Sequence, residues 1–204
     1  MAQKNTFPDI PREIRIRLDE EVRLFLREIA SRSVVIDMGC GHGDYLIDQC
    51  EAFPDKLFVG VEISRKRANY TSERLLKRGF TNYYVVHGDG EAVLRLLFPS
   101  ESVDELHINF PDPWLRMKHW KNRIFQPSFL VEAIRVLKPG ATLDFVTDVA
   151  DYARYVGDII REFPLLENQY DNVVEKNLFD RFPTLFYQRM SPLRHINYIR
   201  FRKG

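Results

Sequence analysis

Apolar residues recur along this chain with two different spacings. Residues 12–31 place apolar side chains close to a 3.6-residue period with charges between them, which predicts an amphipathic helix. Short and nearly continuous apolar runs follow, and runs of this kind are typical of strands buried on both faces. They predict five strands, at residues 33–37, 57–61, 83–86, 103–110 and 141–146.

Helical patterns separate these strands. They predict helices at residues 44–53, 64–78, 91–97, 127–137 and 149–162, with a turn at Lys138-Pro139-Gly140. Strands that alternate with helices form parallel sheets covered on both faces. Residues 184–190 and 196–202 are aromatic and branched runs joined by a proline-containing turn, which predicts a hairpin. We therefore expect an α/β, Rossmann-like fold with a seven-stranded, mostly parallel sheet, a C-terminal antiparallel hairpin and helices on both faces.

Composition is that of one globular domain. The chain has 204 residues, of which 45% are hydrophobic and 29% charged, so we expect a single domain over residues 1–204, with 1–31 as an N-terminal helical extension. No apolar run approaches the roughly 18 residues that a bilayer span needs, and residues 1–7 lack the apolar core of a secretion signal. We expect no membrane partner and a cytoplasmic location, which the two cysteines fit.

A metal centre is not expected. Cys40, His42, Cys50 and His87 are the candidate ligands, but their spacing contains no pair that would bring two ligands together locally. Two buried, neutral thiols are the preferred interpretation.

Charge is distributed unevenly, although the net charge is only +1. Residues 113–131 and 181–204 carry basic side chains and no acid. If the two segments adjoin in space they form a surface suited to phosphates, and aromatic residues between the charges favour a nucleic-acid partner. Two separate solvated faces are the alternative. The basic residues are Arg116, Lys118, Lys121 and Arg123 in the first segment and Arg181, Arg189, Arg194, Arg200, Arg202 and Lys203 in the second.

A glycine-rich turn follows the first predicted strand. Gly39, Gly41 and Gly43 let the backbone approach a ligand closely, and Glu62 ends the next strand about 20 residues later, where an acid can accept both hydroxyls of a ribose. The Gly-x-Gly-x-Gly spacing differs from that of dinucleotide sites, and the flanking acids Asp37 and Asp44 would repel a pyrophosphate. They suit a ligand with an ammonium and a sulfonium, so S-adenosylmethionine is favoured over a nicotinamide cofactor, with Asp89 placed to meet the adenine amine.

A carboxylate stands between two prolines at the end of the fourth strand. Pro111 and Pro113 restrict the backbone on both sides of Asp112, which aims its side chain, and the basic segment follows at once. Ligands of open α/β sheets bind outside the carboxyl ends of the strands. A loop that merely ends the strand is the alternative.

These motifs together resemble the bacterial tRNA (guanine-N7-)-methyltransferases, which belong to the class I methyltransferases. The resemblance covers roughly residues 30–190 in the family's order. It is carried by Asp37-x-Gly39-x-Gly41-x-Gly43, Gly60-Val61-Glu62, Asn109-Phe110-Pro111-Asp112-Pro113-Trp114, Thr147-Asp148 and Thr184-Leu185-Phe186-Tyr187-Gln188-Arg189.

The resemblance implies a methyl donor, a tRNA substrate and a set of site residues. The donor would be contacted by Asp37, Glu62, Asp89 and Asp112, and Asp112 would also face the guanine as the catalytic residue. The implied substrate-binding residues are Arg116, Lys118, Lys121, Asp148, Thr184 and Tyr187. The protein would act as a monomer or homodimer.

The late motif departs from the family's pattern. The family has Lys, Glu and Gly where this chain has Leu185, Tyr187 and Met190, while Thr184 and Phe186 match. Two alternatives to N7 methylation therefore stay open: methylation of an exocyclic amine or another nucleic-acid substrate, and a catalytically silent RNA-binding relative on the same fold.

Overall fold

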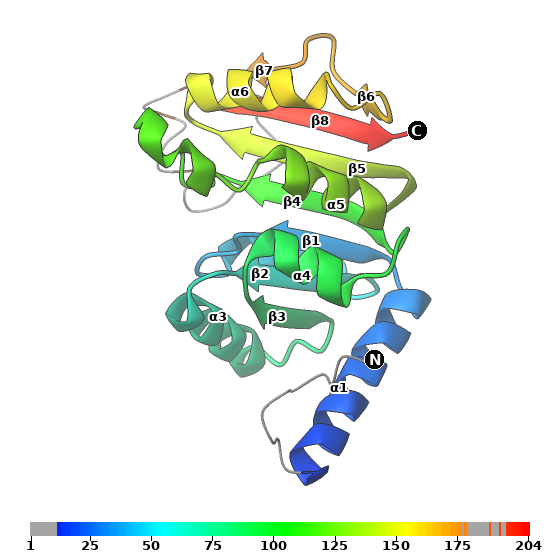
Figure 1. The fold of residues 1–204 in the computed structure, drawn as a ribbon. Helices are drawn as coiled ribbons and strands as arrows, with labels where there is room; N and C mark the ends of the chain where they lie inside the picture. The colour runs from blue at the N-terminus through cyan, green and yellow to red at the C-terminus, as the bar shows by residue number, and fades with distance from the viewer. Residues whose placement is uncertain (1–11, 177, 179–187, 189–191, 193–194) are drawn as a thin grey trace, which may run out of the picture.

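The structure is a computed structural model that describes residues 12–176, 178, 188, 192 and 195–204. Helices and strands alternate through most of the chain, as the two apolar spacings predict (Figure 1). The helices are α1 (Arg12–Ser31), α2 (Asp44–Ala52), α3 (Arg65–Lys77), α4 (Gly90–Leu97), α5 (Pro127–Val136) and α6 (Ala150–Ile160), and a 3-10 helix η1 spans Met117–Asn122. The strands are β1 (Val34–Met38), β2 (Leu57–Glu62), β3 (Tyr83–His87), β4 (Val103–Asn109), β5 (Leu137–Thr147), β6 (Leu166–Asn168), β7 (Glu175–Lys176) and β8 (Asn197–Lys203).

The strands form one mostly parallel sheet in the order β3-β2-β1-β4-β5-β8-β6, with β7 also paired to β8. Strands β1 to β5 are parallel, and β8 is antiparallel to β5. The predicted α/β fold with an antiparallel C-terminal strand is confirmed. The sheet has eight strands rather than seven, because the short strands β6 and β7 add to β8.

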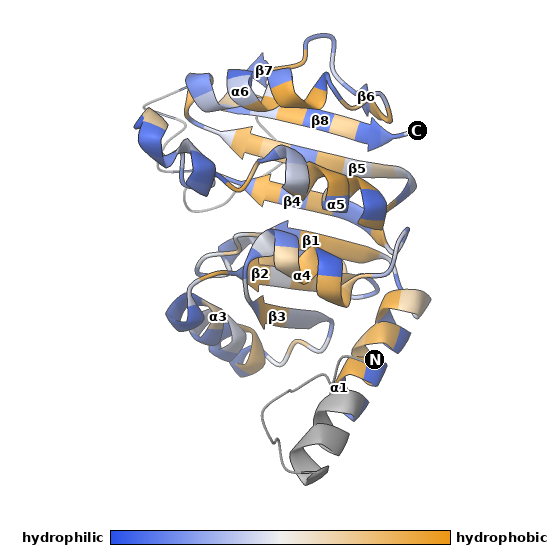
Figure 2. Cartoon of the chain, in the orientation of Figure 1, coloured by the Kyte–Doolittle hydropathy of each residue, from blue (hydrophilic) through white to orange (hydrophobic). Residues whose placement is uncertain are grey.

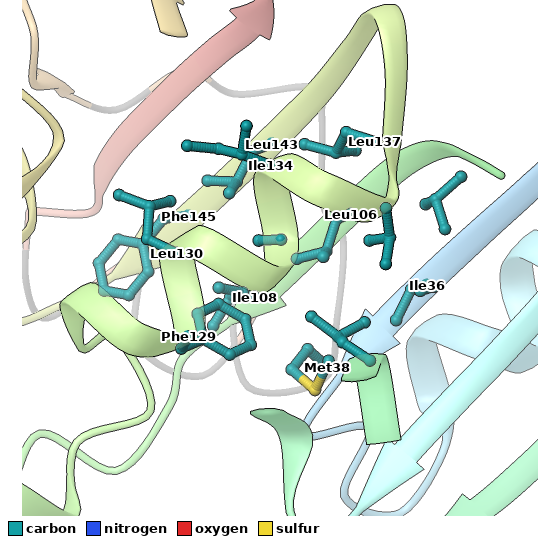
Figure 3. Close-up of a cluster of buried hydrophobic side chains, with 14 of the residues drawn as sticks. Ile36, Met38, Leu106, Ile108, Phe129, Leu130, Ile134, Leu137, Leu143 and Phe145 are labelled. Carbon is teal, nitrogen blue, oxygen red and sulfur yellow. The ribbon is translucent and has the colours of Figure 1, made fainter. Parts of the chain in front are cut away.

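Two layers of helices cover the sheet. The larger apolar cluster joins α1, α4, α5 and α6 to one face, and a smaller cluster joins α2 and α3 to the other. In Figure 2 the hydrophobic colour runs along β1, β4 and β5 and over parts of α4 and α5. Figure 3 shows the centre of the larger cluster, where Phe129 and Leu130 of α5 lie over Ile108 and Phe145. Each fully buried side chain of this kind stabilises the fold by roughly 1.5–3 kcal/mol.

Two local predictions need correction. The apolar spacing predicts no helix in the basic segment after Trp114, but the segment contains the six-residue helix η1. Strand β5 begins at Leu137 rather than 141, because Leu137 pairs with Val103 before the register shifts; the predicted turn at 138–140 lies inside the element, with Gly140 at φ 80°.

The predicted hairpin is only partly described. Its second strand, residues 196–202, is β8. Its first strand, residues 184–190, lies outside the described residues except for Gln188.

Candidate active site

Five acidic residues lie at or just after the ends of five neighbouring parallel strands. Asp37, Glu62, Asp89, Asp112 and Asp148 follow or end β1, β2, β3, β4 and β5, respectively. The arrowheads of these strands point to the same edge of the sheet, the left edge in Figure 1. The sheet therefore gathers at one edge residues that are up to 111 positions apart in the sequence.

The glycine turn after β1 is packed closely against α3. Gly39, Gly41 and Gly43 have φ of 81°, 57° and 80°, a region that favours glycine. A Cβ on Gly43 would lie 2.4 Å from Cγ2 of Thr71, whose hydroxyl donates to the Gly41 carbonyl at 2.9 Å. A Cβ on Gly39 would meet nothing within 4 Å. The turn is thus fixed on the α3 side and open beside Gly39, as a backbone that receives a ligand must be.

Arg74 neutralises one of the acids near this turn. Its guanidinium lies 2.8 Å from Oδ1 of Asp44 and also donates to the His42 carbonyl. Asp44 therefore connects α2 to α3. Because its charge is paired, Asp44 contributes less than the other acids to the predicted repulsion of a pyrophosphate.

Glu62 is almost completely buried and joins three segments. One carboxylate oxygen accepts from the Gly41 amide at 3.0 Å, and the other accepts from the Ser64 amide at 2.8 Å and from Nη2 of Arg67 at 2.7 Å. The hydrogen bond to Glu62 is the largest cause of the raised pKa of Arg67, and Asp112 contributes to it as well. Arg67 is therefore a site residue that the sequence reading missed, because no recognised motif contains its position.

Asp37 is buried at 2% exposure at the end of β1. Burial raises the pKa of Asp37 to about 7, while His107 and the Asn109 amide, whose Nδ2 is 3.4 Å from Oδ1, oppose the rise. A buried carboxyl with this pKa is easily ionised when a cation approaches.

His107 lies in a row of charges that crosses the sheet. In register, Asp37, His107, Asp144 and Arg200 stand side by side on β1, β4, β5 and β8. The His107 ring lies 3.4 Å from Asp144 and 3.2 Å from Glu105. The row places the His107 ring next to Asp37, whose pKa it lowers against the effect of burial.

Asp89 has a structural role that the sequence reading did not assign. Its Oδ1 accepts from the Ala92 amide at 3.0 Å, so it caps the N-terminus of α4. The side chain is nevertheless exposed at the ligand edge.

The loop from Phe110 to Trp114, which contains both prolines, is held in an uncommon backbone conformation. Phe110 and Trp114 have φ of 48° and 42°, which non-glycine residues adopt rarely, and Asp112 stands exposed between them. Such strain concentrates at functional sites.

The basic segments are divided by burial. Arg116, Lys118 and Lys121 are exposed, whereas Arg123 is 3% exposed and lies in the interior. Arg200 is bound to buried Asp144 through two hydrogen bonds of 2.5 and 2.8 Å. The expectation that Arg123 belongs to a phosphate-binding surface is therefore wrong, because its side chain is buried. Arg200 is partly exposed, but its charge is paired with Asp144.

Some predicted residues are not placed. Thr184, Tyr187, Phe186 and the other late-motif positions Leu185 and Met190 lie outside the described residues. Trp114, a candidate for stacking on a base, is 39% exposed.

Within the described ranges no group of three His, Cys, Asp or Glu side chains is arranged to hold a metal, and no helix there is long and apolar enough to cross a membrane.

The architecture defines the class of this protein. The chain superposes on a SAM-dependent methyltransferase from Aquifex aeolicus with a TM-score of 0.60 and 16% identity, over 90% of both chains, so it has the class I methyltransferase fold. A family model described as putative methyltransferase matches residues 31–195.

Two curated relatives define the family more closely. The chain is 36% identical over 128 residues to a tRNA (guanine-N(7)-)-methyltransferase from Nitrosococcus oceani and 32% identical over 162 residues to one from Nitrosomonas europaea. These matches cover 63% and 78% of this chain and 54% and 72% of the relatives, so the chain spans from about half to nearly three quarters of their length. The chain belongs to the bacterial tRNA (guanine-N7-)-methyltransferase family.

Proposed function

We propose that this protein transfers a methyl group from S-adenosylmethionine to N7 of a guanine in tRNA. The observation that carries the proposal is the strained Pro-Asp-Pro loop at the end of β4, which presents an exposed carboxylate beside the glycine turn and the buried acids of β1 and β2. Family membership supports the same reaction.

The residues of the site fit the donor. Buried Glu62 and the open backbone at Gly39 and Gly41 suit a ribose, and Asp37 suits an ammonium group because its carboxyl ionises readily near neutral pH. Asp89 is assigned to the adenine side of the site. When bound, S-adenosylmethionine supplies a methyl group on a sulfonium.

Asp112 is proposed to orient the guanine. N7 carries an in-plane lone pair and no proton, so the transfer requires alignment and compensation of charge rather than a general base. The Asp112 carboxylate accepts a hydrogen bond from the N–H groups of the base and offsets the positive charge that develops on it. Asp112 does not need to change its protonation state.

The exposed side chains of Arg116, Lys118 and Lys121 are proposed to hold phosphates of the tRNA. They lie in and next to η1, directly beyond the loop that carries Asp112. Asp148 at the end of β5, together with Thr184 and Tyr187, completes the proposed substrate contacts. Trp114 is a candidate to stack on an extruded base.

The setting of the enzyme is part of the proposal. We assign it to the cytoplasm, as a monomer or homodimer with a single domain over residues 1–204 in which 1–31 is a helical extension. The free, buried thiols of Cys40 and Cys50 suit a reducing compartment.

The deciding experiment is transfer of labelled methyl from S-adenosylmethionine to unmodified bulk tRNA, followed by nucleoside analysis. We expect 7-methylguanosine. Label on an exocyclic amine would point to the competing reaction, and donor binding without any transfer would point to a silent relative; either result overturns the proposal.

A further inference from the structure

Arg123 is a buried cation with an unusual environment. Its guanidinium lies 4.3, 4.5 and 4.8 Å from the ring centroids of Trp120, Tyr152 and Tyr155. Among the described residues no carboxylate forms an ion pair with it, and its Nη1 has no hydrogen-bond partner. The three ring faces stabilise the charge in place of an acid.

The guanidinium also reaches the loop of the proposed active site. Nε of Arg123 donates to the carbonyl oxygen of Pro113 at 2.9 Å, and Pro113 directly follows Asp112. The contact is to the backbone. The Asp112 carboxylate therefore stays available to a substrate. An ion pair between the side chains of Arg123 and Asp112 would occupy it.

The loop needs an anchor at each end, because its conformation is unfavourable in isolation. Both Phe110 and Trp114 are left-handed residues that surrounding contacts must hold in place. The first end is fixed by the Phe110 amide, which donates to the Val146 carbonyl at 2.8 Å, and by the Phe110 side chain, which packs against the apolar cluster that contains Val146. The second end is fixed by Arg123.

Arg123 is itself held firmly. Nε2 of Gln126 donates to the carbonyls of Trp120 and Arg123 at 2.8 and 3.2 Å, and the Tyr155 hydroxyl lies 3.3 Å from Oε1 of Gln126. Helix α6 therefore supports η1, and both support the guanidinium.

We propose that Arg123 is a positioning residue for methyl transfer, which holds the Asp112 loop in its strained conformation from inside the protein. The catalytic part of this inference, the effect of Arg123 on methyl transfer, rests on the proposed function. It assigns to Arg123 a role different from the phosphate binding that its place in the basic segment suggests.

The test compares Arg123→Lys with Arg135→Lys. Arg135 is a matched control, because its guanidinium also donates to backbone carbonyls, those of Phe98 and Leu94 at 3.0 and 2.8 Å, but away from the proposed site. A lysine at either position keeps the charge and loses the planar guanidinium.

We expect Arg123→Lys to lower kcat at least tenfold, with KM for tRNA and donor affinity changed less than threefold. Arg135→Lys is expected to lower the melting temperature and to keep the wild-type kcat. A wild-type kcat in folded Arg123→Lys, or an equal loss of donor binding, would overturn the inference.

Hydrogen exchange provides a readout that does not depend on activity. The Phe110 amide, which is hydrogen-bonded to the Val146 carbonyl, should exchange faster in Arg123→Lys than in the wild type, and at the wild-type rate in Arg135→Lys. If the wild-type protein methylates no tRNA, the proposed function fails. Faster exchange confined to the loop would still show that Arg123 anchors the loop rather than contributing to general stability. Unchanged exchange would overturn the anchoring role of Arg123.

A second variant covers the case in which Arg123→Lys does not fold. Tyr155→Leu removes one ring from the guanidinium and leaves Arg123 in place. We expect a smaller effect of the same kind, a threefold or greater loss of kcat with faster exchange of the Phe110 amide. If neither quantity changes, the result counts against the inference.

Discussion

At the scale of single residues, the proposed site depends on carboxylates whose surroundings differ. Asp112 is exposed on a strained loop, whereas Asp37 and Glu62 are buried at 2% exposure. Burial raises the pKa of Asp37, and three donors hold Glu62. The same chemical group can thus orient a substrate in one position and bind a cation or a hydroxyl in another.

Asp112→Asn is expected to reduce methyl transfer at least a hundredfold with little change in the melting temperature. The substitution removes the negative charge that offsets the developing charge on guanine, and the exposed side chain contributes little to folding. Asp55→Asn, an exposed aspartate next to the opposite ends of the strands, is the control. Full activity in folded Asp112→Asn would remove the assigned role.

The raised pKa of Asp37 gives donor binding a pH dependence. Below pH 7 the carboxyl is increasingly protonated, so we expect donor affinity, measured by calorimetry, to fall about tenfold between pH 8 and pH 6. An affinity independent of pH would mean that the ammonium of the donor does not contact Asp37.

Stability changes in the opposite direction. The pKa of Asp37 is raised from 3.8 to about 7, so its contribution to stability is lost as the pH rises from 3.8 to about 7, where the unfolded chain has already released the proton that the folded protein still holds. Asp37→Asn should therefore raise the free energy of unfolding more at pH 8 than at pH 5, by on the order of a few kcal/mol, while weakening donor binding. An equal effect of the substitution at both pH values would contradict this cause.

At the scale of elements, η1 separates the two uses of the basic segment. Its exposed lysines, with Arg116 at its N-terminal boundary, face solvent, while Arg123 directly after it is enclosed by aromatic rings. A short 3-10 helix turns successive residues in different directions, so adjacent positive charges are available for the proposed RNA binding on one side and the proposed loop anchoring on the other.

Arg116→Ala combined with Lys121→Ala should weaken tRNA binding about tenfold or more at low salt and reduce the salt dependence by about two phosphate contacts. Lys77→Ala combined with Arg161→Ala removes two exposed charges at the ends of α3 and α6 and should have little effect. The measurement is tRNA affinity over a range of salt concentrations. Equal losses in both double variants would mean that only overall charge matters.

At the scale of the whole molecule, the site joins segments that fold together. Glu62 connects β2, the glycine turn and α3, and the larger apolar cluster holds the sheet beneath them. A ligand that binds only this assembled edge should stabilise the entire domain against unfolding.

S-adenosylhomocysteine at about 100 times its Kd should raise the melting temperature by roughly 5–10 °C, since such an excess stabilises the folded state by about 2.7 kcal/mol. Glu62→Gln should lose most of this rise, and Glu20→Gln on the exposed face of α1 should retain it. The comparison uses thermal unfolding with and without ligand. A full rise in folded Glu62→Gln would exclude Glu62 from the ligand site.

The sequence by itself determined the order of the elements, the α/β class and the edge at which the acids gather. Apolar spacing is a local property, and parallel strands bring their carboxyl ends to one edge, so Asp37, Glu62 and Asp112 could be assigned to one site from their positions after strands.

Only the tertiary structure decided how each charge is used. Arg200 is bound to Asp144, 56 residues away, and the rings around Arg123 come partly from α6, so neither the ion pair of Arg200 nor the burial of Arg123 could be read from the neighbouring sequence. The pKa of Asp37 likewise depends on its burial in the complete fold. The physical reason is that periodicity records which face of an element is apolar, while the state of a charge depends on partners that only the complete fold brings close.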